Sequence, residues 1–257
     1  MLRIVDTRTG DSVQAAPARR GLTRVEAHAP SFTAASVRVL LTADLLVRAL
    51  ELGGTPVWSM LAGGRGEAEL RAAAATLGIR PFEDGHDLAA GLGEAQIVHV
   101  LEEGGQLPWS GVVLQVAGVW DETGVAGDDI GGVRDEAGDD DGPRSDPAVL
   151  RLALLSTDRG SPVRLDDATL DEARRTLARW RRAVAGWARQ PSRAVPDEVR
   201  GRLRAAWEDN LDVPEVLRVL TWVETATDLP DGARFETYAY ADRLLGLDLV
   251  RDLGSPE

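Results

Sequence analysis

Residues 23–61 read TRVEAHAPSFTAASVRVLLTADLLVRALELGGTPVWSML. Apolar residues recur at helical spacing over residues 34–52, and the pair Gly53-Gly54 closes the run, so this stretch predicts a helix. Short β-like runs precede it at residues 23–27 and follow it at residues 56–61. A helix that connects two strands in this way is the repeating unit of a parallel sheet.

The same alternation continues on both sides of this segment. Further strand-like runs occupy residues 2–5, 96–101 and 111–117, an alanine-rich helix is expected at residues 67–77, and a short helical turn at residues 84–93. The sequence therefore predicts an α/β fold, with a Rossmann-like doubly wound parallel sheet in a first domain of residues 1–120.

The composition changes after residue 120. Residues 121–144 are rich in glycine and aspartate and predict an acidic loop or linker without the spacing of a calcium-binding loop. From residue 145 onward, helical periodicity predicts a bundle domain of residues 145–257, whose helices are expected to start at Asp146-Pro147 and to cover residues 165–187, 195–207, 213–225 and 233–245. We interpret the tryptophans at positions 180, 187, 207 and 222 as packing residues.

Composition also excludes several kinds of chemistry. The chain of 257 residues has no cysteine, and all 29 basic residues are arginine, so thiolate ligands, thiol nucleophiles and catalytic lysines are absent. A net charge of −13 opposes nonspecific nucleic-acid binding, and we expect the arginine-rich residues 164–204 to serve internal charge balance. The start of the chain has no apolar signal region, so we expect a cytoplasmic protein without membrane contact.

Several stretches resemble one known family. LRIVDT at residues 2–7, TADLLVRAL at 42–50 and DPAVLRLALLS at 146–156 are similar to the cysteinyl-tRNA synthetases and their actinobacterial branch, the mycothiol cysteine ligases. The resemblance continues with SPVRLD at residues 161–166, ARWRRAV at 178–184, WEDNLDVPEVL at 207–217 and LLGL at 244–247. Of these, WEDNLDVPEVL looks like the start of a bundle helix of the family. The resemblance covers most of residues 1–60 and, more closely, residues 145–250.

This resemblance implies a class I synthetase fold and a set of catalytic motifs that can be checked. The His-Ile-Gly-His turn that holds ATP phosphates in the family falls at residues 33–36, where Thr33 and Ser36 predict a plain helix cap. In place of the lysine loop that precedes Asp146 stands an acidic segment, residues 135–141, and the nearby Arg134 and Arg144 are surrounded by acids. The family's zinc ion is held by cysteines, a histidine and a glutamate, so that site cannot be built in its usual form and zinc is not expected.

Two other groups of residues are candidate sites. His28, His86 and His99 have no metal-ligand spacing, and we interpret each as a surface or satisfied core histidine. Residues 62–67, AGGRGE, follow a strand and precede a helix, as phosphate-binding turns do, and Arg65 offers charge; a structural turn is favoured because the glycine pattern is incomplete. We therefore assign no catalytic, cofactor-binding or metal residue.

The first hypothesis for function is a catalytically degenerate, non-catalytic binding or regulatory module with a cysteinyl-tRNA synthetase-like fold. Its partner would be a protein or a small molecule rather than nucleic acid. The alternative is an ATP-dependent ligase or adenylating enzyme, specific for cysteine or another amino acid, that works with arginines and hydroxyls. A third possibility, a nucleic-acid binder that uses the arginine-rich helices, is opposed by the net charge.

Overall fold

The central element of the fold is a sheet of five parallel strands. The structure is a computed structural model that describes residues 1–17, 21–84, 94–106, 108, 110–124 and 146–254. The strands follow the order β5-β4-β3-β6-β7, with bounds β3 Leu22–Ser31, β4 Val57–Arg65, β5 Glu83–Asp84, β6 Glu94–Glu102 and β7 Val112–Val116. Chain order runs outward from β3 to one edge and from β6 to the other, so the topological switch point lies between β3 and β6. The predicted doubly wound parallel sheet is confirmed.

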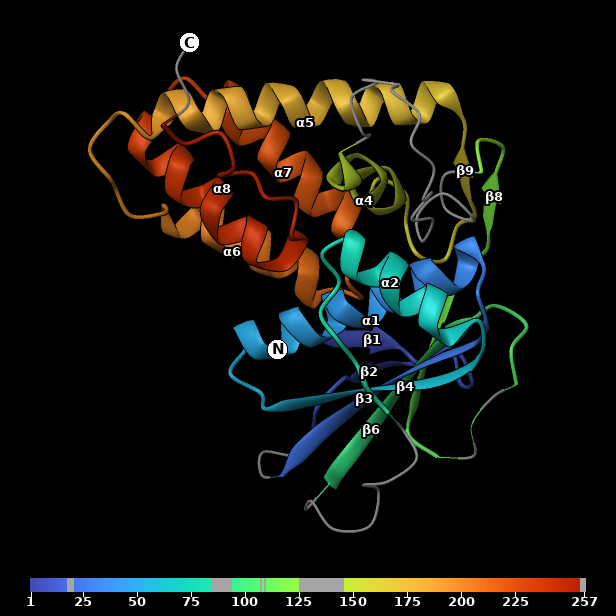
Figure 1. Cartoon of the computed structure of the whole chain (residues 1–257). Helices are drawn as coiled ribbons and strands as arrows, with labels where there is room; N and C mark the ends of the chain where they lie inside the picture. The colour runs from blue at the N-terminus through green and yellow to red at the C-terminus, as the bar shows by residue number, and fades with distance from the viewer. Residues whose placement is uncertain (18–20, 85–93, 107, 109, 125–145, 255–257) are drawn as a thin grey trace.

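Helix α1 (Ala34–Leu52) lies between this sheet and the C-terminal helices, as Figure 1 shows. Most of its 19 residues are buried. A helix that is apolar nearly all round needs cover on every side, and here the sheet covers one side while the C-terminal helices cover the other. The bounds predicted for this helix agree with the structure. Helix α2 (Glu67–Thr76) packs beside it.

Five helices form the C-terminal part: α4 (Pro147–Leu155), α5 (Asp167–Trp187), α6 (Asp197–Glu208), α7 (Val213–Thr225) and α8 (Asp231–Leu245). Three of them begin at an aspartate whose carboxylate accepts a backbone N–H of the first turn, namely Asp146, Asp166 and Asp212. These caps explain why the helix starts could be predicted closely from sequence.

The C-terminal part is not entirely helical, which corrects the sequence-based prediction. Val163–Leu165 forms strand β9, which pairs in parallel with β8 (Val119–Asp121). A second small sheet, of β1 (Arg3–Val5) and β2 (Ser12–Gln14), is antiparallel. The run predicted at residues 2–5 contains β1, whereas β2, β8 and β9, with three residues each, are too short for a periodic pattern to be recognised in the sequence.

Two further predictions are corrected or lie outside the described residues. Asp84 belongs to strand β5 rather than to a helical turn, and the rest of that predicted turn, residues 85–93, is outside the described part of the chain. The acidic loop expected at residues 121–144 is described only to residue 124, and Asp121 ends β8.

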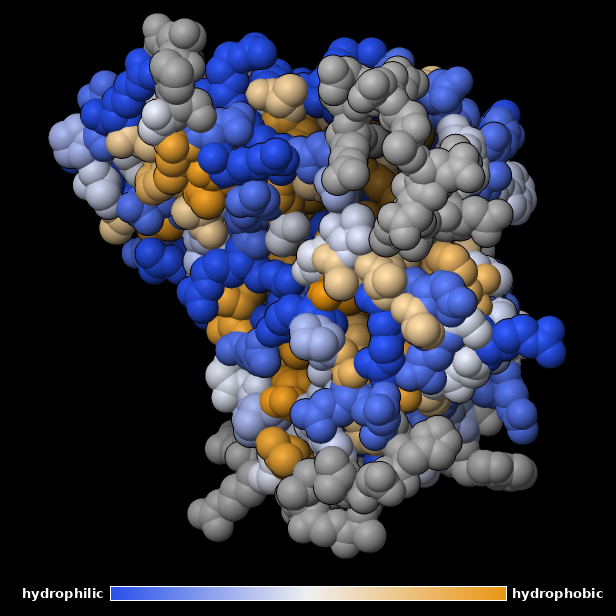
Figure 2. All heavy atoms as spheres, in the orientation of Figure 1, coloured by the Kyte–Doolittle hydropathy of each residue, from blue (hydrophilic) through white to orange (hydrophobic). Residues whose placement is uncertain are grey.

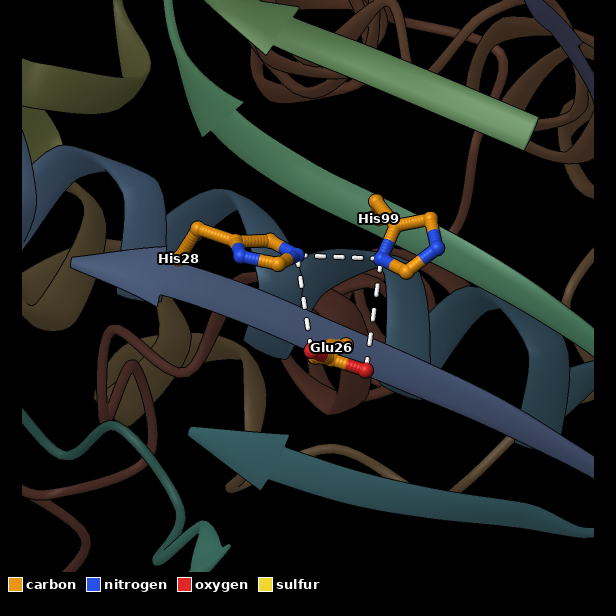
Figure 3. Close-up of side chains that lie close together, drawn as sticks. All are labelled: Glu26, His28 and His99. Atoms are coloured by element: carbon orange, nitrogen blue, oxygen red, sulfur yellow. Dashed lines mark hydrogen bonds and ion pairs between the residues drawn. The ribbon is translucent and has the colours of Figure 1, made fainter. Parts of the chain in front are cut away.

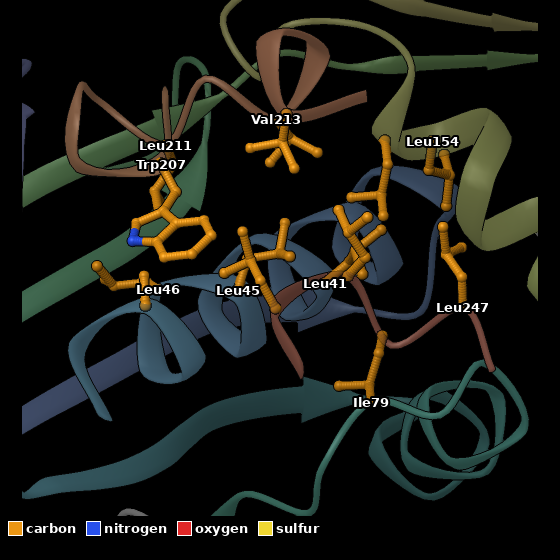
Figure 4. Packing of buried hydrophobic residues seen from close by; sticks show 14 of the residues in the cluster. Leu41, Leu45, Leu46, Ile79, Leu154, Trp207, Leu211, Val213 and Leu247 are labelled. Carbon is orange, nitrogen blue, oxygen red and sulfur yellow. The ribbon is translucent and has the colours of Figure 1, made fainter. Parts of the chain in front are cut away.

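One hydrophobic core connects the sheet, α1 and the C-terminal helices. Figure 4 shows leucines of α1 facing side chains from α4, the α6–α7 region and the chain beyond α8; the labelled residues are Leu41, Leu45, Leu46, Ile79, Leu154, Trp207, Leu211, Val213 and Leu247. In Figure 2, hydrophilic side chains cover most of the face in view, and hydrophobic ones appear in small groups. Within the described residues, no helix combines the length and the apolar character that a bilayer crossing requires.

The tryptophans serve packing, as predicted. Trp180 and Trp187 both meet the ring of the buried Tyr238 edge-on, at centroid distances of 5.8 and 5.1 Å. Trp207 is buried in the core, while Trp222 is partly buried beneath the guanidinium of Arg202, 4.5 Å from the ring centre.

Arginines hold the layers together through buried bonds. Arg151 of α4 donates to Asp44 of α1 at 3.0 Å and to the carbonyls of Leu77 and Leu245. Asp44 also accepts Arg48 at 2.8 Å and Arg80 at 2.9 Å, so this carboxylate has three cationic partners. Burial by itself would raise the pKa of Asp44, but Arg151 and Arg48 outweigh burial and lower it.

The arginine-rich helices balance their charge internally, as predicted. Their partners are mostly acids of the same or the neighbouring helix, in the pairs Arg174–Asp171, Arg175–Glu172, Arg179–Glu224, Arg200–Asp197, Arg202–Glu198 and Arg204–Glu208. Most of these side chains are exposed, so each pair contributes little to stability.

Candidate functional site

The N-terminus of α1 lies at the carboxyl edge of the sheet, where ligands of this fold class bind. Thr33 is its N-cap, and the Thr33 hydroxyl accepts the backbone N–H of Ser36 at 3.0 Å. The Ser36 hydroxyl donates to the carbonyl of Ser31 at 2.7 Å. Both hydroxyls are thus committed to the backbone, and the helix cap predicted for these two residues is present.

The glycine-rich stretch at residues 62–67 forms a shorter turn than the sequence predicted, because most of it belongs to β4. Gly63, Gly64 and Arg65 continue the strand, and Gly66, with φ of 75°, is the N-cap of α2. A Cβ on Gly64 would overlap the carbonyl of Pro30, so this glycine allows β4 to approach the end of β3. Residues 63–65 are therefore strand rather than the predicted turn, and only Gly66 turns the chain into α2.

Carboxylates occupy the start of α2. Glu67 and Glu69 stand in its first turn, where negative charge favours the helix dipole. The Glu67 carboxylate lies over Gly63 and also pairs with Arg71 at 2.8 Å. A phosphate placed at this helix start would meet these carboxylates. Arg65 is exposed at the end of β4, where it is in register with Ser31.

Arg38, in the second turn of α1, is the buried cation closest in sequence to the helix start. Its guanidinium donates to four carbonyls, those of Ala117, Thr157, Asp158 and Ser161. Burial lowers the pKa of Arg38 to about 10, so it remains charged at neutral pH. Its bonds join α1 to the segment between α4 and β9. The sequence candidates Arg134 and Arg144, and the acidic residues 135–141, lie outside the described residues.

On the opposite face of β3 from the core, three side chains converge that the sequence did not connect. Val25 and Ala27 point into the core, so Glu26 and His28 share the other face. His99 of β6 is the register partner of Glu26. Figure 3 shows Glu26, His28 and His99 pointing toward one another from these two strands. We call this group the Glu-His-His cluster.

The distances within the Glu-His-His cluster are short. His28 Nε2 lies 3.0 Å from His99 Nδ1, and the Glu26 carboxylate lies 3.6 Å from His28 Nε2 and 4.0 Å from His99 Nδ1. Among the residues that the structure describes, this is the one group of three His, Cys, Asp or Glu side chains whose ligand atoms are close enough for a single metal ion.

The surroundings keep both imidazoles neutral at pH 7. His99 is only 5% exposed, and Met60 and Leu101, which flank Glu26 and His28 in register, are buried. Burial lowers the pKa of His99 to about 4, against a smaller raising effect of Glu26. Burial also lowers the pKa of His28, and Glu26 again opposes the shift.

The far edge of the His99 ring is held by the backbone before β7. A hydrogen bond with the Ser110 backbone raises the pKa of His99, which means that the ring donates this bond. A Cβ on Gly111 would lie 3.2 Å from His99 Nε2 and 2.8 Å from the carbonyl of Ile97. Gly111, with φ of 80°, thus permits the backbone to pass close to the ring.

Sequence spacing could not reveal this cluster. Glu26 and His28 are two residues apart on one strand, but His99 joins them only through the pairing of β3 with β6, 71 residues later. The pattern Glu-x-His within a strand was the available signal, because alternate residues share a face. His86, the third histidine, lies outside the described residues.

Comparison with known proteins places part of this sequence among ligases. A stretch of 119 residues is 35% identical to the L-cysteine:1D-myo-inositol 2-amino-2-deoxy-alpha-D-glucopyranoside ligase of Kytococcus sedentarius, covering 40% of this chain and 27% of that protein. The enzyme of the same name from Streptomyces griseus is 39% identical over 110 residues, 40% of this chain and 25% of the relative. A cysteine–tRNA ligase from Methylocella silvestris is 35% identical over 110 residues, 43% of this chain and 21% of the relative.

This chain is a relative of the cysteine ligases. The matched stretch spans about a quarter of the length of these relatives, so most of each ligase has no counterpart in the match. No family model matches the chain. The similarity and the α/β sheet together support the synthetase-like family that the sequence motifs indicated.

Proposed function

We propose that this relative of the cysteine ligases is catalytically degenerate and acts as a binding or regulatory module. The observation that carries the proposal is the occupation of both helix starts at the carboxyl edge of the sheet. At the start of α1 the Thr33 hydroxyl accepts the backbone N–H of Ser36, and at the start of α2 Glu67 and Glu69 place negative charge. ATP phosphates would need those N–H groups and a positive environment.

The composition supports the same conclusion independently of any alignment. Adenylation of an amino acid develops negative charge on the phosphates, which a nearby cation would have to stabilise. The buried arginine near the start of α1, Arg38, already donates its hydrogen bonds to four backbone carbonyls. The chain has no lysine that could replace it. We infer that the ligand of the module is a small molecule or a protein rather than nucleic acid, since the net charge is −13.

The test is exchange of labelled pyrophosphate into ATP in the presence of cysteine. We expect no exchange above the blank with cysteine or with any other standard amino acid, while a cysteine–tRNA ligase in the same buffer gives a strong signal. Amino-acid-dependent exchange by the purified chain would contradict the proposal.

The second candidate is a ligase or adenylating enzyme with an altered active site, and one observation favours it. Arg65 is exposed at the carboxyl end of β4, close to the start of α1, because the backbone N–H of Phe32 donates to the Arg65 carbonyl at 3.1 Å. Calorimetric titration with ATP and magnesium, beside the pyrophosphate exchange, tests this second candidate. Binding that is lost in Arg65→Ala and kept in the exposed control Arg174→Ala would favour the ligase.

A further inference from the structure

We propose that Glu26, His28 and His99 bind one divalent transition-metal ion of the zinc type, with a coordination position left open to water or an incoming ligand. The site would use one carboxylate and two imidazoles and no thiolate. It therefore differs in its ligands from the zinc site that the family resemblance implies, which the chain cannot build without cysteine. This inference does not depend on whether the chain activates amino acids.

The geometry is close to that of a formed site. Ligand atoms at about 2.0–2.2 Å from a tetrahedral zinc ion are separated from one another by about 3.3–3.5 Å. The two imidazole nitrogens are 3.0 Å apart, and the separations of 3.6 and 4.0 Å run from them to different oxygens of the Glu26 carboxylate, Oε1 and Oε2. One ligand atom from each residue lies within 4.8 Å of the other two, so rotation of the side chains would bring all three to one ion.

The hydrogen bond of His99 to the backbone prepares its ring for a metal. Because the Nε2 edge faces Ser110 and Gly111 and the ring donates there, Nδ1 is left with its lone pair directed at His28 and Glu26. Metal-binding histidines commonly donate their second N–H to a backbone carbonyl in this manner. His28 Nε2 now supplies the proton of the bond between the two rings, so metal binding requires the His28 proton to move to Nδ1.

The position of the cluster supports ligand binding rather than packing alone. It bridges β3 and β6, the two strands that flank the topological switch point, on the face of the sheet and a few residues before their carboxyl ends. His28 and Glu26 are partly exposed, with 28% and 19% of their side-chain surfaces accessible, so an ion can reach the site from solvent.

One neighbouring group competes with a cation. Arg24, two residues before Glu26 on the same face, pairs with the Glu26 carboxylate at 3.4 Å. Its positive charge opposes a metal ion both directly and by holding one carboxylate oxygen. The proposal therefore makes an unusual prediction: removal of this arginine should strengthen metal binding, although it removes a side chain from the site.

Titration of the untagged, metal-free chain with Co(II) tests the site, because cobalt bound to imidazole and carboxylate gives visible ligand-field bands whereas aqueous cobalt gives weak ones. We expect one equivalent to bind and to be displaced by Zn(II). His28→Gln, His99→Gln and Glu26→Gln should each weaken binding by more than the roughly 10–100-fold that loss of an outer-shell partner causes. Arg24→Gln should bind more tightly than the unaltered chain.

His86→Gln is the matched control, because it removes the only other histidine of the chain. It should leave the cobalt spectrum and the affinity unchanged. Far-UV circular dichroism of each variant shows whether it folds, and imidazole NMR of the unaltered chain reports the ligands directly, since only two of its three histidines should respond to zinc.

Several results would overturn the proposal. These are no cobalt spectrum at millimolar metal, binding that survives in both folded histidine variants, or loss of binding in His86→Gln. None of these results bears on pyrophosphate exchange, so the metal site and the proposed function fail separately.

Discussion

Two buried polar groups lie on the two sides of the central sheet, and they are satisfied in different ways. On the α1 side, Asp44 is 1% exposed and is surrounded by Arg151, Arg48 and Arg80. On the other side, the Glu-His-His cluster combines two neutral imidazoles with a carboxylate that already pairs with Arg24. The first group is charged and has its hydrogen bonds made, whereas the second has nitrogen lone pairs that a cation can use.

The two groups differ in what their polar side chains do: the first stabilises the packing of the layers, and the second can bind a ligand. A buried charge that meets complementary partners on every side fixes how layers pack, and Arg151 does so by joining α4, α8 and the end of α2 to α1. A pair of neutral histidines, one buried and one partly exposed, stabilises little, and such perturbed groups are characteristic of binding sites.

The largest effect is expected from breaking the first group. Asp44→Ala leaves Arg151 buried without its carboxylate, and we expect the free energy of unfolding to fall by about 3–5 kcal/mol. Urea denaturation followed by circular dichroism measures this change. The exposed pair of Arg174 and Asp171 supplies the control, since Asp171→Ala should not change stability measurably. Equal effects of the two substitutions would contradict the structural role of Asp44.

The next effect is on the dependence of stability on pH. The pKa of His99 is lowered to about 4 in the folded chain, so between its usual value near 6.5 and pH 4 the unfolded state binds the extra proton. Stability should therefore fall by about 1–3 kcal/mol as pH decreases through this window. In His99→Gln the decrease should be smaller, and an unchanged pH profile would show that His99 is not held neutral.

Gly111→Ala should disturb the cluster through its backbone support. The added methyl group meets the Ile97 carbonyl and the His99 ring at a positive φ, so we expect a loss of about 1–3 kcal/mol in stability together with weaker cobalt binding. Gly78→Ala has a similar φ with open space around it and should cost only about 1 kcal/mol, without an effect on cobalt. Equal losses of stability and of cobalt binding in the two variants would show that Gly111 does not support the His99 ring.

The smallest effect concerns Arg24, measured by histidine NMR in metal-free protein. Arg24 lowers the pKa of both histidines through its charge and also pairs with Glu26. Arg24→Gln should therefore raise both pKa values, by less than about one unit because the site is partly open to solvent. A fall in either value would show that Arg24 does not act on the cluster in this way.

Much of the fold was accessible from sequence for local reasons. The helix at Ala34–Leu52 was found with its bounds because Thr33 and Gly53 mark its ends and apolar residues repeat between them. The three aspartate caps of the C-terminal helices acted in the same way. The short strand β9 was missed, since Val163–Leu165 is a strand only because β8 lies beside it.

The site was less accessible. The cap at Thr33 was predicted, whereas the turn at Gly63 and Gly64 was not recognised as strand, because its extent depends on the approach of Pro30. No spacing in the sequence indicates that His28 and His99 lie close together, because their contact results from the pairing of β3 with β6.

By itself, the sequence determined the alternation of strands and helices, the absence of thiolates and lysines, and the relation to cysteine ligases. These are properties of residue type and local order. Only the tertiary structure decided that Arg38 and Arg151 are buried between layers and that Glu26, His28 and His99 form one cluster. The physical reason is that burial and proximity between distant residues arise when strands pair and layers pack, and local periodicity contains no record of which strands will be neighbours.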